Sequence, residues 1–84
     1  MQPEEIKRLI EAGIAGCTAD VTGPDGTHFD AIIVSGQFSG RSLVQRHQLV
    51  YRALGERMGR EIHALSMQTL TPDEWEKTRG LRVV

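Results

Sequence analysis

Aromatic residues and cysteines are scarce in this chain of 84 residues, and each shortage excludes a class of protein. Aromatic side chains make up 5% of the sequence, which leaves few platforms on which the bases of a single-stranded nucleic acid could stack. The single cysteine, Cys17, excludes an internal disulfide and suits a reducing compartment. The chain lacks an apolar run of about 18 residues and a signal-peptide pattern, so we expect a soluble cytoplasmic protein without a membrane segment.

The length of the chain also limits what it can enclose. A domain of this size buries only about 60% of the surface of its unfolded chain, too little to surround a deep substrate pocket. We therefore expect a single domain over residues 1–84. The three histidines cannot be assigned partners for a Ser-His-Asp triad, and no paired carboxylates stand out. The sequence predicts a protein that is not an enzyme.

Charge is unevenly distributed although the net charge is only −1. The stretch from residue 41 to residue 60 holds five arginines and a single acidic residue, Glu56. These arginines are Arg41, Arg46, Arg52, Arg57 and Arg60. Such a stretch is either a solvated helix face or a surface that attracts an anionic partner such as DNA.

Periodicity predicts the order helix, strand, strand, helix (in one or two pieces), strand, helix. The first helix opens at Pro3, buries Ile6, Leu9 and Ile10, and ends at Gly13 or Gly16. Strands over 17–22 and 29–35 flank a Gly-Pro-Asp-Gly turn and form a hairpin.

The second half of the chain begins with a central helix whose N-cap is Ser42. It loosens near Gly55 and Gly59, and a third strand follows over 61–70. The sequence Thr-Pro-Asp-Glu over 71–74 is a capping box, and it opens a last helix. We expect Trp75 to anchor this helix and Gly80 to stop it.

The central helix carries an apolar stripe that we expect to bury against the sheet. Its members are Leu43, Val44, Val50, Tyr51 and Leu54. His47 falls in the middle of this stripe, which predicts a hydrogen-bonded core histidine rather than a ligand. A crossover through this helix makes strands two and three parallel. The expected fold is α+β, with helices packed on a three-stranded mixed sheet.

Three sequence blocks carry a resemblance to a known family. They are Phe38-x-Gly40-x-Ser42-x-Val44-x-Arg46-His47-x-x-Val50, then Ile62-His63-Ala64-Leu65, then Thr71-Pro72-x-Glu74-Trp75. In this order and spacing they resemble the BolA-like family (BolA/IbaG type), and the match covers nearly the whole chain. The resemblance implies a fold akin to the type II KH domain.

The resemblance also implies a function. BolA-like proteins pair with monothiol glutaredoxins and share a bridging 2Fe–2S cluster with them, in iron–sulfur trafficking or iron sensing. The implied ligands in this chain are His63, at the start of the third strand, and His28, at the hairpin loop. No cluster is expected in the isolated protein, and a homodimer of the apo form stays open.

Parallel strands start at the same end of a sheet, so His28 and His63 should share one end and Cys17 should lie at the other. Two histidines are a weak metal signal by themselves. His28 could equally be a solvent-exposed hairpin residue, and His63 a histidine bonded to backbone at a strand edge.

DNA binding is the alternative function, suggested by the KH-like fold and by the five arginines. A KH domain grips the nucleic-acid backbone with a GxxG loop between its helices, and none occurs between residues 41 and 61. The Gly-Ile-Ala-Gly over 13–16 has that spacing but lies in a different connection. A helix-turn-helix style of contact, as in a transcriptional regulator, stays open.

Overall fold

The computed structural model describes the backbone of residues 1–82 and the side chains of residues 1–78. Its three strands form one sheet in the order β1-β2-β3. Strands β1 (Cys17–Thr22) and β2 (His28–Ser35) are antiparallel, and β3 (Ala64–Leu70) runs parallel to β2. The α+β fold and the predicted strand directions are confirmed.

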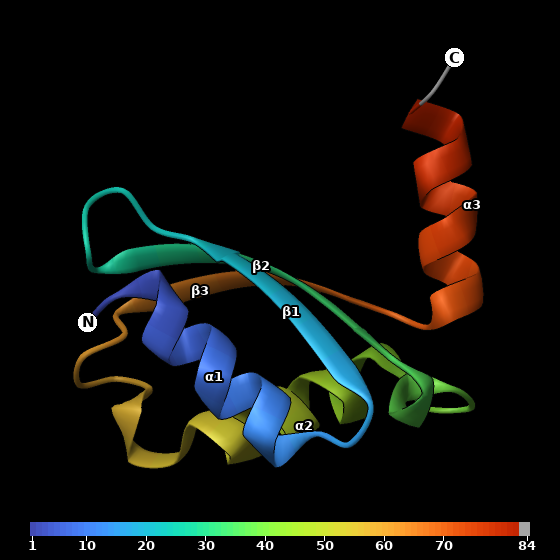
Figure 1. Ribbon diagram of the computed structural model, residues 1–84. Helices are drawn as coiled ribbons and strands as arrows, with labels where there is room; N and C mark the ends of the chain where they lie inside the picture. Colours follow the sequence, from blue (N-terminus) through green and yellow to red (C-terminus); the bar gives the residue numbers. More distant parts are fainter. Residues whose placement is uncertain (83–84) are drawn as a thin grey trace.

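The helices lie on two sides of this sheet. Helices α1 (Pro3–Gly13) and α2 (Leu43–Leu54) lie side by side on one face of the sheet. Helix α3 (Pro72–Arg82) follows the C-terminal end of β3 and rises on the opposite face (Figure 1). A turn of 3-10 helix, η1 (Gly36–Phe38), precedes α2 and another, η2 (Gly55–Arg57), follows it. The predicted break after the central helix is therefore confirmed, and it begins at Gly55.

The core lies between the sheet and the pair α1 and α2. Most of its members are large aliphatic side chains together with two phenylalanines. The buried set is Ile6, Ile10, Ile14, Ala19, Phe29, Ala31, Ile33, Phe38, Val50, Leu54 and Ile62. Leu9, predicted to be buried, packs half-buried against this core.

The rotation of α2 differs from the prediction. Val50 and Leu54 are buried, but Leu43, Val44 and Tyr51 are 62%, 66% and 43% exposed. The reason is the close packing of α1 against α2, where a Cβ added at Gly13 would stand 2.6 Å from the Ala53 Cβ. This contact turns the buried arc of α2 towards the Ala53 side, and the Val44–Tyr51 side faces outward.

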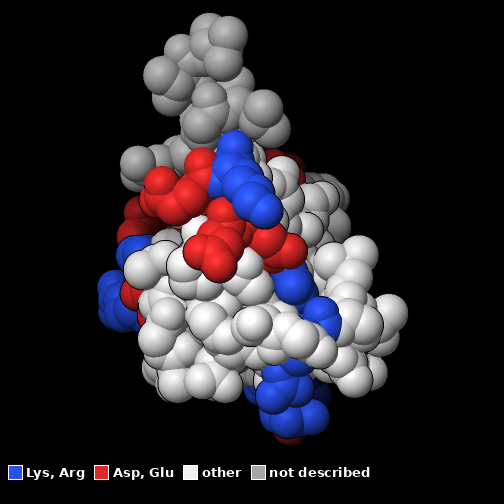
Figure 2. Space-filling model, turned by 90° about the vertical axis from the view of Figure 1, so that its right-hand side faces the viewer, with Lys and Arg blue, Asp and Glu red and all other residues white. Residues whose placement is uncertain are grey.

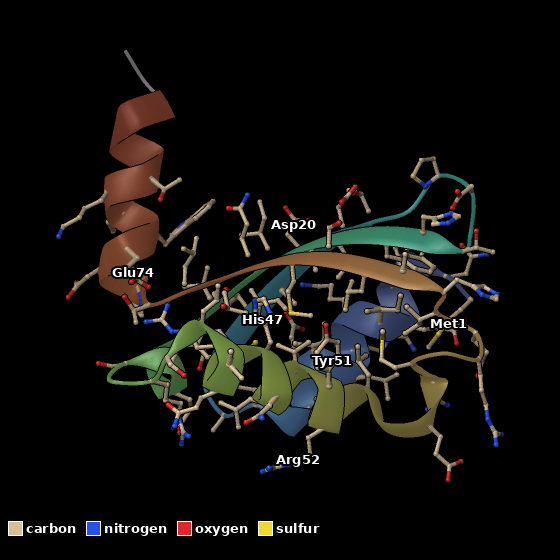
Figure 3. All side chains as sticks on the ribbon, turned by 180° about the vertical axis from the view of Figure 1, so that it is seen from behind. Met1, Asp20, His47, Tyr51, Arg52 and Glu74 are labelled. Carbon is tan, nitrogen blue, oxygen red and sulfur yellow. The ribbon has the colours of Figure 1, made fainter. Side chains whose placement is uncertain are left out.

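His47 lies on α2 between the helix and the sheet (Figure 3). Its ring Nε2 is buried and has no hydrogen-bond partner within the part of the chain that the structure describes. The prediction of a hydrogen-bonded core histidine is therefore wrong for Nε2, which no polar group of the described chain reaches. The buried Oγ1 of Thr69 on β3 also has no hydrogen-bond partner in the described part of the chain.

Two element boundaries differ from the sequence-based expectation by more than one residue, and β2 begins at His28 rather than at residue 29. Strand β3 begins at Ala64 and not at residue 61, because residues 57–62 form a turn in which the Ile62 N–H donates to the Arg57 carbonyl (3.0 Å). Helix α3 continues through Gly80 to Arg82, since one helical glycine costs only about 1 kcal/mol. The capping box is confirmed: the Thr71 N–H donates to Glu74 Oε1 (2.8 Å), and the Glu74 N–H donates to Thr71 Oγ1 (3.2 Å).

Side chains of α1 and α2 satisfy backbone groups of the two edge strands. At β1, Lys7 Nζ donates to the Ala19 carbonyl (2.7 Å), and the Ala19 N–H donates to Glu11 Oε2 (3.0 Å). At β3, Arg46 Nη1 donates to the Thr69 carbonyl (3.0 Å). These contacts cover part of each edge that would otherwise be open to another strand. Within residues 1–82, none of the helices has both the length and the apolar character needed to cross a bilayer.

Candidate metal site

The hairpin end of the sheet, formed by residues 25–28 and 63, brings the two predicted ligands together. In the parallel ladder of β2 and β3, His28 is the register partner of Ala64, and His63 directly precedes that residue. The His63 N–H donates to the Thr27 carbonyl (3.2 Å), so the two chain segments are directly joined. Both histidines are exposed. The predicted placement at one end is confirmed, with His63 one residue before β3.

The β1–β2 turn holds His28 through Asp25. Asp25 Oδ1 accepts the N–H groups of Thr27 (3.0 Å) and His28 (2.8 Å), and Asp25 Oδ2 lies 2.8 Å from His28 Nδ1. Hydrogen bonds hold the pKa of Asp25 far below its ordinary value. The His28 N–H contributes most, the Thr27 N–H comes next, and the His28 imidazole contributes less. Gly26 makes the turn possible with φ +77°, which a residue with a side chain rarely adopts.

Asp25 was missed as a site residue by sequence reasoning, which assigned it only to the turn. A signal was present, because an aspartate two or three residues before a strand commonly accepts the backbone N–H groups that follow it. The contact between its second oxygen and the imidazole depends on the ring orientation, which no sequence pattern specifies.

Two exposed imidazoles on adjacent segments are suitable ligands for iron, zinc or copper. A 2Fe–2S cluster takes four protein ligands, and histidine can replace cysteine at one of its irons. Among the described residues, no group of three or more histidine, cysteine, aspartate or glutamate side chains could hold a metal ion. The donor set therefore fits half of a cluster site, and the other ligands would have to come from a second molecule.

Cys17 lies at the far end of the sheet, as predicted, opposite Ser35 in the antiparallel ladder. Its side chain is half-buried, and this burial, together with the Glu11 carboxylate, raises the pKa of the thiol to about 11. Thiolate, and not thiol, is the form that binds metal. Cys17 is therefore separated from the hairpin end and is a poor ligand near neutral pH.

The five arginines of the DNA-binding alternative are not equally available at the surface. Arg46 is only 13% exposed, because Nη1 donates to Glu74 Oε1 (2.7 Å) as well as to the Thr69 carbonyl. Arg57 pairs loosely with Glu61 (3.8 Å). Arg52 points away from the sheet on the outer side of α2, far from Glu74 at the base of α3 (Figure 3). Arg46 is thus engaged in contacts inside the fold, which disfavours it as a phosphate-binding candidate.

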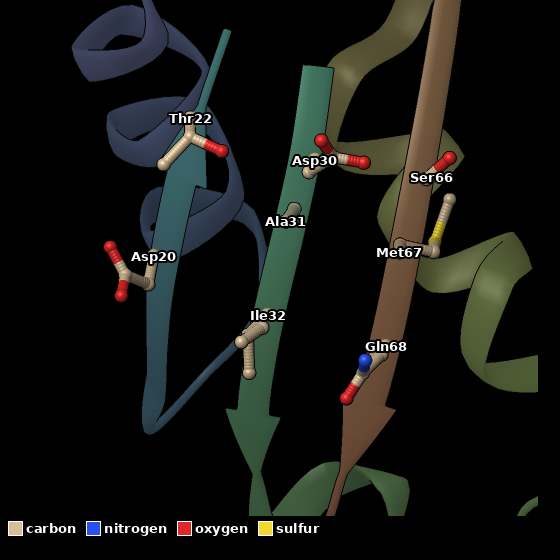
Figure 4. A pocket seen from close by; sticks show the side chains of 8 residues that line it. All are labelled: Asp20, Thr22, Asp30, Ala31, Ile32, Ser66, Met67 and Gln68. Atoms are coloured by element: carbon tan, nitrogen blue, oxygen red, sulfur yellow. The ribbon is translucent and has the colours of Figure 1, made fainter.

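The open face of the sheet is acidic and does not suit a nucleic acid. A shallow hollow of about 300 Å³ lies there, and the carboxylates of Asp20 and Asp30 line it together with polar and apolar side chains (Figure 4). In the view of Figure 2, acidic side chains gather in the upper part of the described surface beside one basic group, and further basic side chains lie apart from them lower down. Any phosphate contact would therefore have to use the helical side of the molecule.

Known proteins resemble this chain in both sequence and fold. The family model described as BolA-like protein matches residues 12–74, about three quarters of the chain. The chain belongs to the BolA-like family. A solved BolA homologue from Coxiella burnetii shares 43% identity and superimposes with a TM-score of 0.82 over 90% of this chain and 97% of its own.

Two relatives of this BolA-like chain carry informative names. BolA-like protein 1 of Mus musculus is 42% identical over 99% of this chain and 58% of its own length. A protein of Haemophilus influenzae named DNA-binding transcriptional regulator BolA is 44% identical over 60% of this chain and 48% of its own. The chain spans only 40% to 58% of the BolA-like protein 1 relatives that it matches.

Proposed function

We propose that this BolA-like chain is a non-enzymatic adaptor that pairs with a monothiol glutaredoxin and shares a bridging 2Fe–2S cluster with it. His63 and His28 would be its own ligands, and the cluster would be cargo for iron–sulfur trafficking or iron sensing. The single observation that carries the proposal is the hairpin end, where the Thr27–His63 backbone hydrogen bond (3.2 Å) joins two segments that each present an exposed imidazole.

The chemistry of the hairpin end supports a shared cluster. Two imidazoles supply half of the ligands, and glutaredoxins carry the thiol that favours iron–sulfur chemistry. The only cysteine of this chain is at the opposite end, and its thiol stays protonated near neutral pH. Histidine ligation also raises the potential of a cluster relative to all-thiolate ligation, which suits release or sensing.

The test is anaerobic reconstitution of the mixture of this chain with a monothiol glutaredoxin. We expect a heterodimer whose visible absorption and circular dichroism differ from those of the glutaredoxin alone, with no cluster spectrum from this chain alone. A spectrum that is unchanged by addition of this chain, together with separate elution of the two proteins, would exclude the proposal.

DNA binding is the second candidate function, and the name of the Haemophilus influenzae relative favours it. The structure leaves Arg41, Arg52, Arg57 and Arg60 exposed. Phosphate contacts make affinity fall steeply with salt, whereas sharing of a cluster does not. Each lost phosphate contact should lower the salt slope by about one unit. Binding to a DNA duplex that is unaffected by Arg52→Ala and Arg60→Ala would exclude these residues.

A further inference from the structure

The contact between Asp25 and His28 distinguishes the two proposed ligands from each other. Asp25 Oδ2 lies 2.8 Å from His28 Nδ1, and Thr27 Oγ1 lies 3.1 Å from the same ring atom. The His63 ring, by contrast, makes no hydrogen bond in the part of the chain that the structure describes, where only its backbone N–H is engaged. An ionised carboxylate only accepts hydrogen bonds. The ring atom that faces Asp25 must therefore carry the proton.

We infer that Asp25 is a positioning residue that holds His28 with its proton on Nδ1 and so leaves Nε2 as the atom that binds iron. The inference rests on the proposed function, because it names the ligating atom of one proposed ligand. A carboxylate behind a ligating histidine fixes the ring orientation and raises the basicity of the ligand. Loss of such a partner commonly weakens metal binding by about 10- to 100-fold.

The two oxygens of Asp25 have separable tasks. Oδ1 holds the turn by accepting the backbone N–H groups of Thr27 and His28, whereas Oδ2 faces the imidazole. An asparagine can keep the first task, because its carbonyl oxygen still accepts both N–H groups. Its amide NH₂ then takes the place of Oδ2 and donates to Nδ1. Asp25→Asn should therefore preserve the turn but move the ring proton of His28 to Nε2.

The first measurement uses the isolated protein and needs no metal. Long-range ¹H–¹⁵N spectra of the histidine rings, taken near pH 9 where ordinary imidazoles are neutral, report which nitrogen carries the proton. We expect His28 protonated on Nδ1 in the wild type and on Nε2 in Asp25→Asn. Asp20→Asn is the matched control, because it removes one exposed carboxylate of β1 that makes no contact with His28. An unchanged His28 tautomer in Asp25→Asn would overturn the inference.

The second measurement uses the cluster-loaded complex with a monothiol glutaredoxin. Asp25→Asn should lose its cluster about 10- to 100-fold faster than the wild type, and Asp20→Asn should lose it at the wild-type rate. Pulsed EPR of the reduced cluster, with ¹⁵N placed at Nε2 of histidine, should show the Nε2 coupling in the wild type.

The outcomes distinguish the positioning role of Asp25 from the adaptor function of the chain. A cluster in Asp25→Asn that is as stable as the wild type, despite an inverted tautomer, overturns the positioning role and leaves the adaptor function intact. A wild-type mixture that forms no cluster refutes the adaptor function, and the ligating role of Nε2 falls with it. The tautomer assignment is still decided by the spectra of the isolated protein.

Discussion

The two ends of the sheet differ in what happens to their polar side chains. At the hairpin end, His28 and His63 are exposed, and only one of the two rings has a hydrogen-bond partner among the described residues. At the far end, Ser35 is fully buried, where its Oγ donates to the Ala15 carbonyl (3.0 Å) and accepts the Gln37 N–H (3.1 Å). Nitrogen lone pairs at the first end remain available for metal, whereas at the second end internal contacts occupy the hydroxyl of Ser35.

The contacts of Arg46 form a second network at the far end of the sheet. Arg46 lies over the Phe38 ring (6.0 Å to the centroid) and joins the end of β3 to the first turn of α3 through Glu74. With the proposed ligation at the hairpin end, the chain would separate stability from metal binding along the length of its sheet. Substitutions at the far end should therefore change the free energy of unfolding, and those at the hairpin end should change metal binding.

The largest effect is expected at His63. His63→Ala removes one of the two proposed ligands and should abolish the cluster of the complex with a monothiol glutaredoxin, while His28→Ala should leave it labile. Cys17→Ser, at the opposite end, should leave the visible absorption of the complex unchanged. If Cys17→Ser bleached the complex and His63→Ala kept its colour, the division between the two ends would be wrong.

Next in size is the loss of the buried ring at the far end. Phe38 is fully buried in the core, and Phe38→Ala should lower the free energy of unfolding by about 3–5 kcal/mol. The exposed His28 supplies the contrast, and His28→Ala should stay within about 0.5 kcal/mol of the wild type. Urea unfolding followed by circular dichroism measures both, and similar losses for the two variants would contradict the separation of stability from metal binding.

A smaller loss is expected when Arg46 is removed. Arg46→Ala breaks the hydrogen bond to the Thr69 carbonyl and the packing on Phe38, which should cost about 1–3 kcal/mol. Arg52→Ala is the matched control, because its exposed side chain makes no contact with the sheet, and its effect should be below about 0.5 kcal/mol. Equal unfolding midpoints for Arg46→Ala and the wild type would show that these contacts of Arg46 contribute nothing to stability.

The cost of Arg46→Ala should depend on pH in a defined direction. Hydrogen bonds from Arg46 and from the Thr71 N–H lower the pKa of Glu74. A lowered pKa contributes stability above the ordinary glutamate pKa, and this contribution is lost as pH falls through the folded-state value. The difference between wild type and Arg46→Ala should therefore shrink below about pH 4.

The smallest effect concerns the reactivity of Cys17. Because burial raises the pKa of this thiol to about 11, alkylation by iodoacetamide near pH 8 should be about tenfold or more slower than for an unperturbed thiol. The raised pKa contributes stability below the unfolded value near 8.5, and this is lost as pH rises through about 11. A reaction rate that levels off near pH 9 would show an exposed thiol at the far end.

Local sequence signals determined most of the secondary structure. Pro3, the capping box at Thr71 and the Gly-Pro-Asp-Gly turn each act within a few residues, so their outcome could be predicted without knowing the fold. The common end of His28 and His63 followed from topology alone, since parallel strands joined by a crossover helix begin at the same end of a sheet.

Only the tertiary structure decided which arc of α2 is buried and what its polar residues do. Periodicity identifies apolar residues, but the packing of α1 beside α2 selects Val50 and Leu54 over Val44 and Tyr51. The contacts of Arg46 reach Thr69 and Glu74, 23 and 28 positions away. Contacts at such separations depend on the relative placement of whole elements, which short-range patterns do not encode. For that reason Arg46, a phosphate-binding candidate in the sequence, has a structural role in the fold.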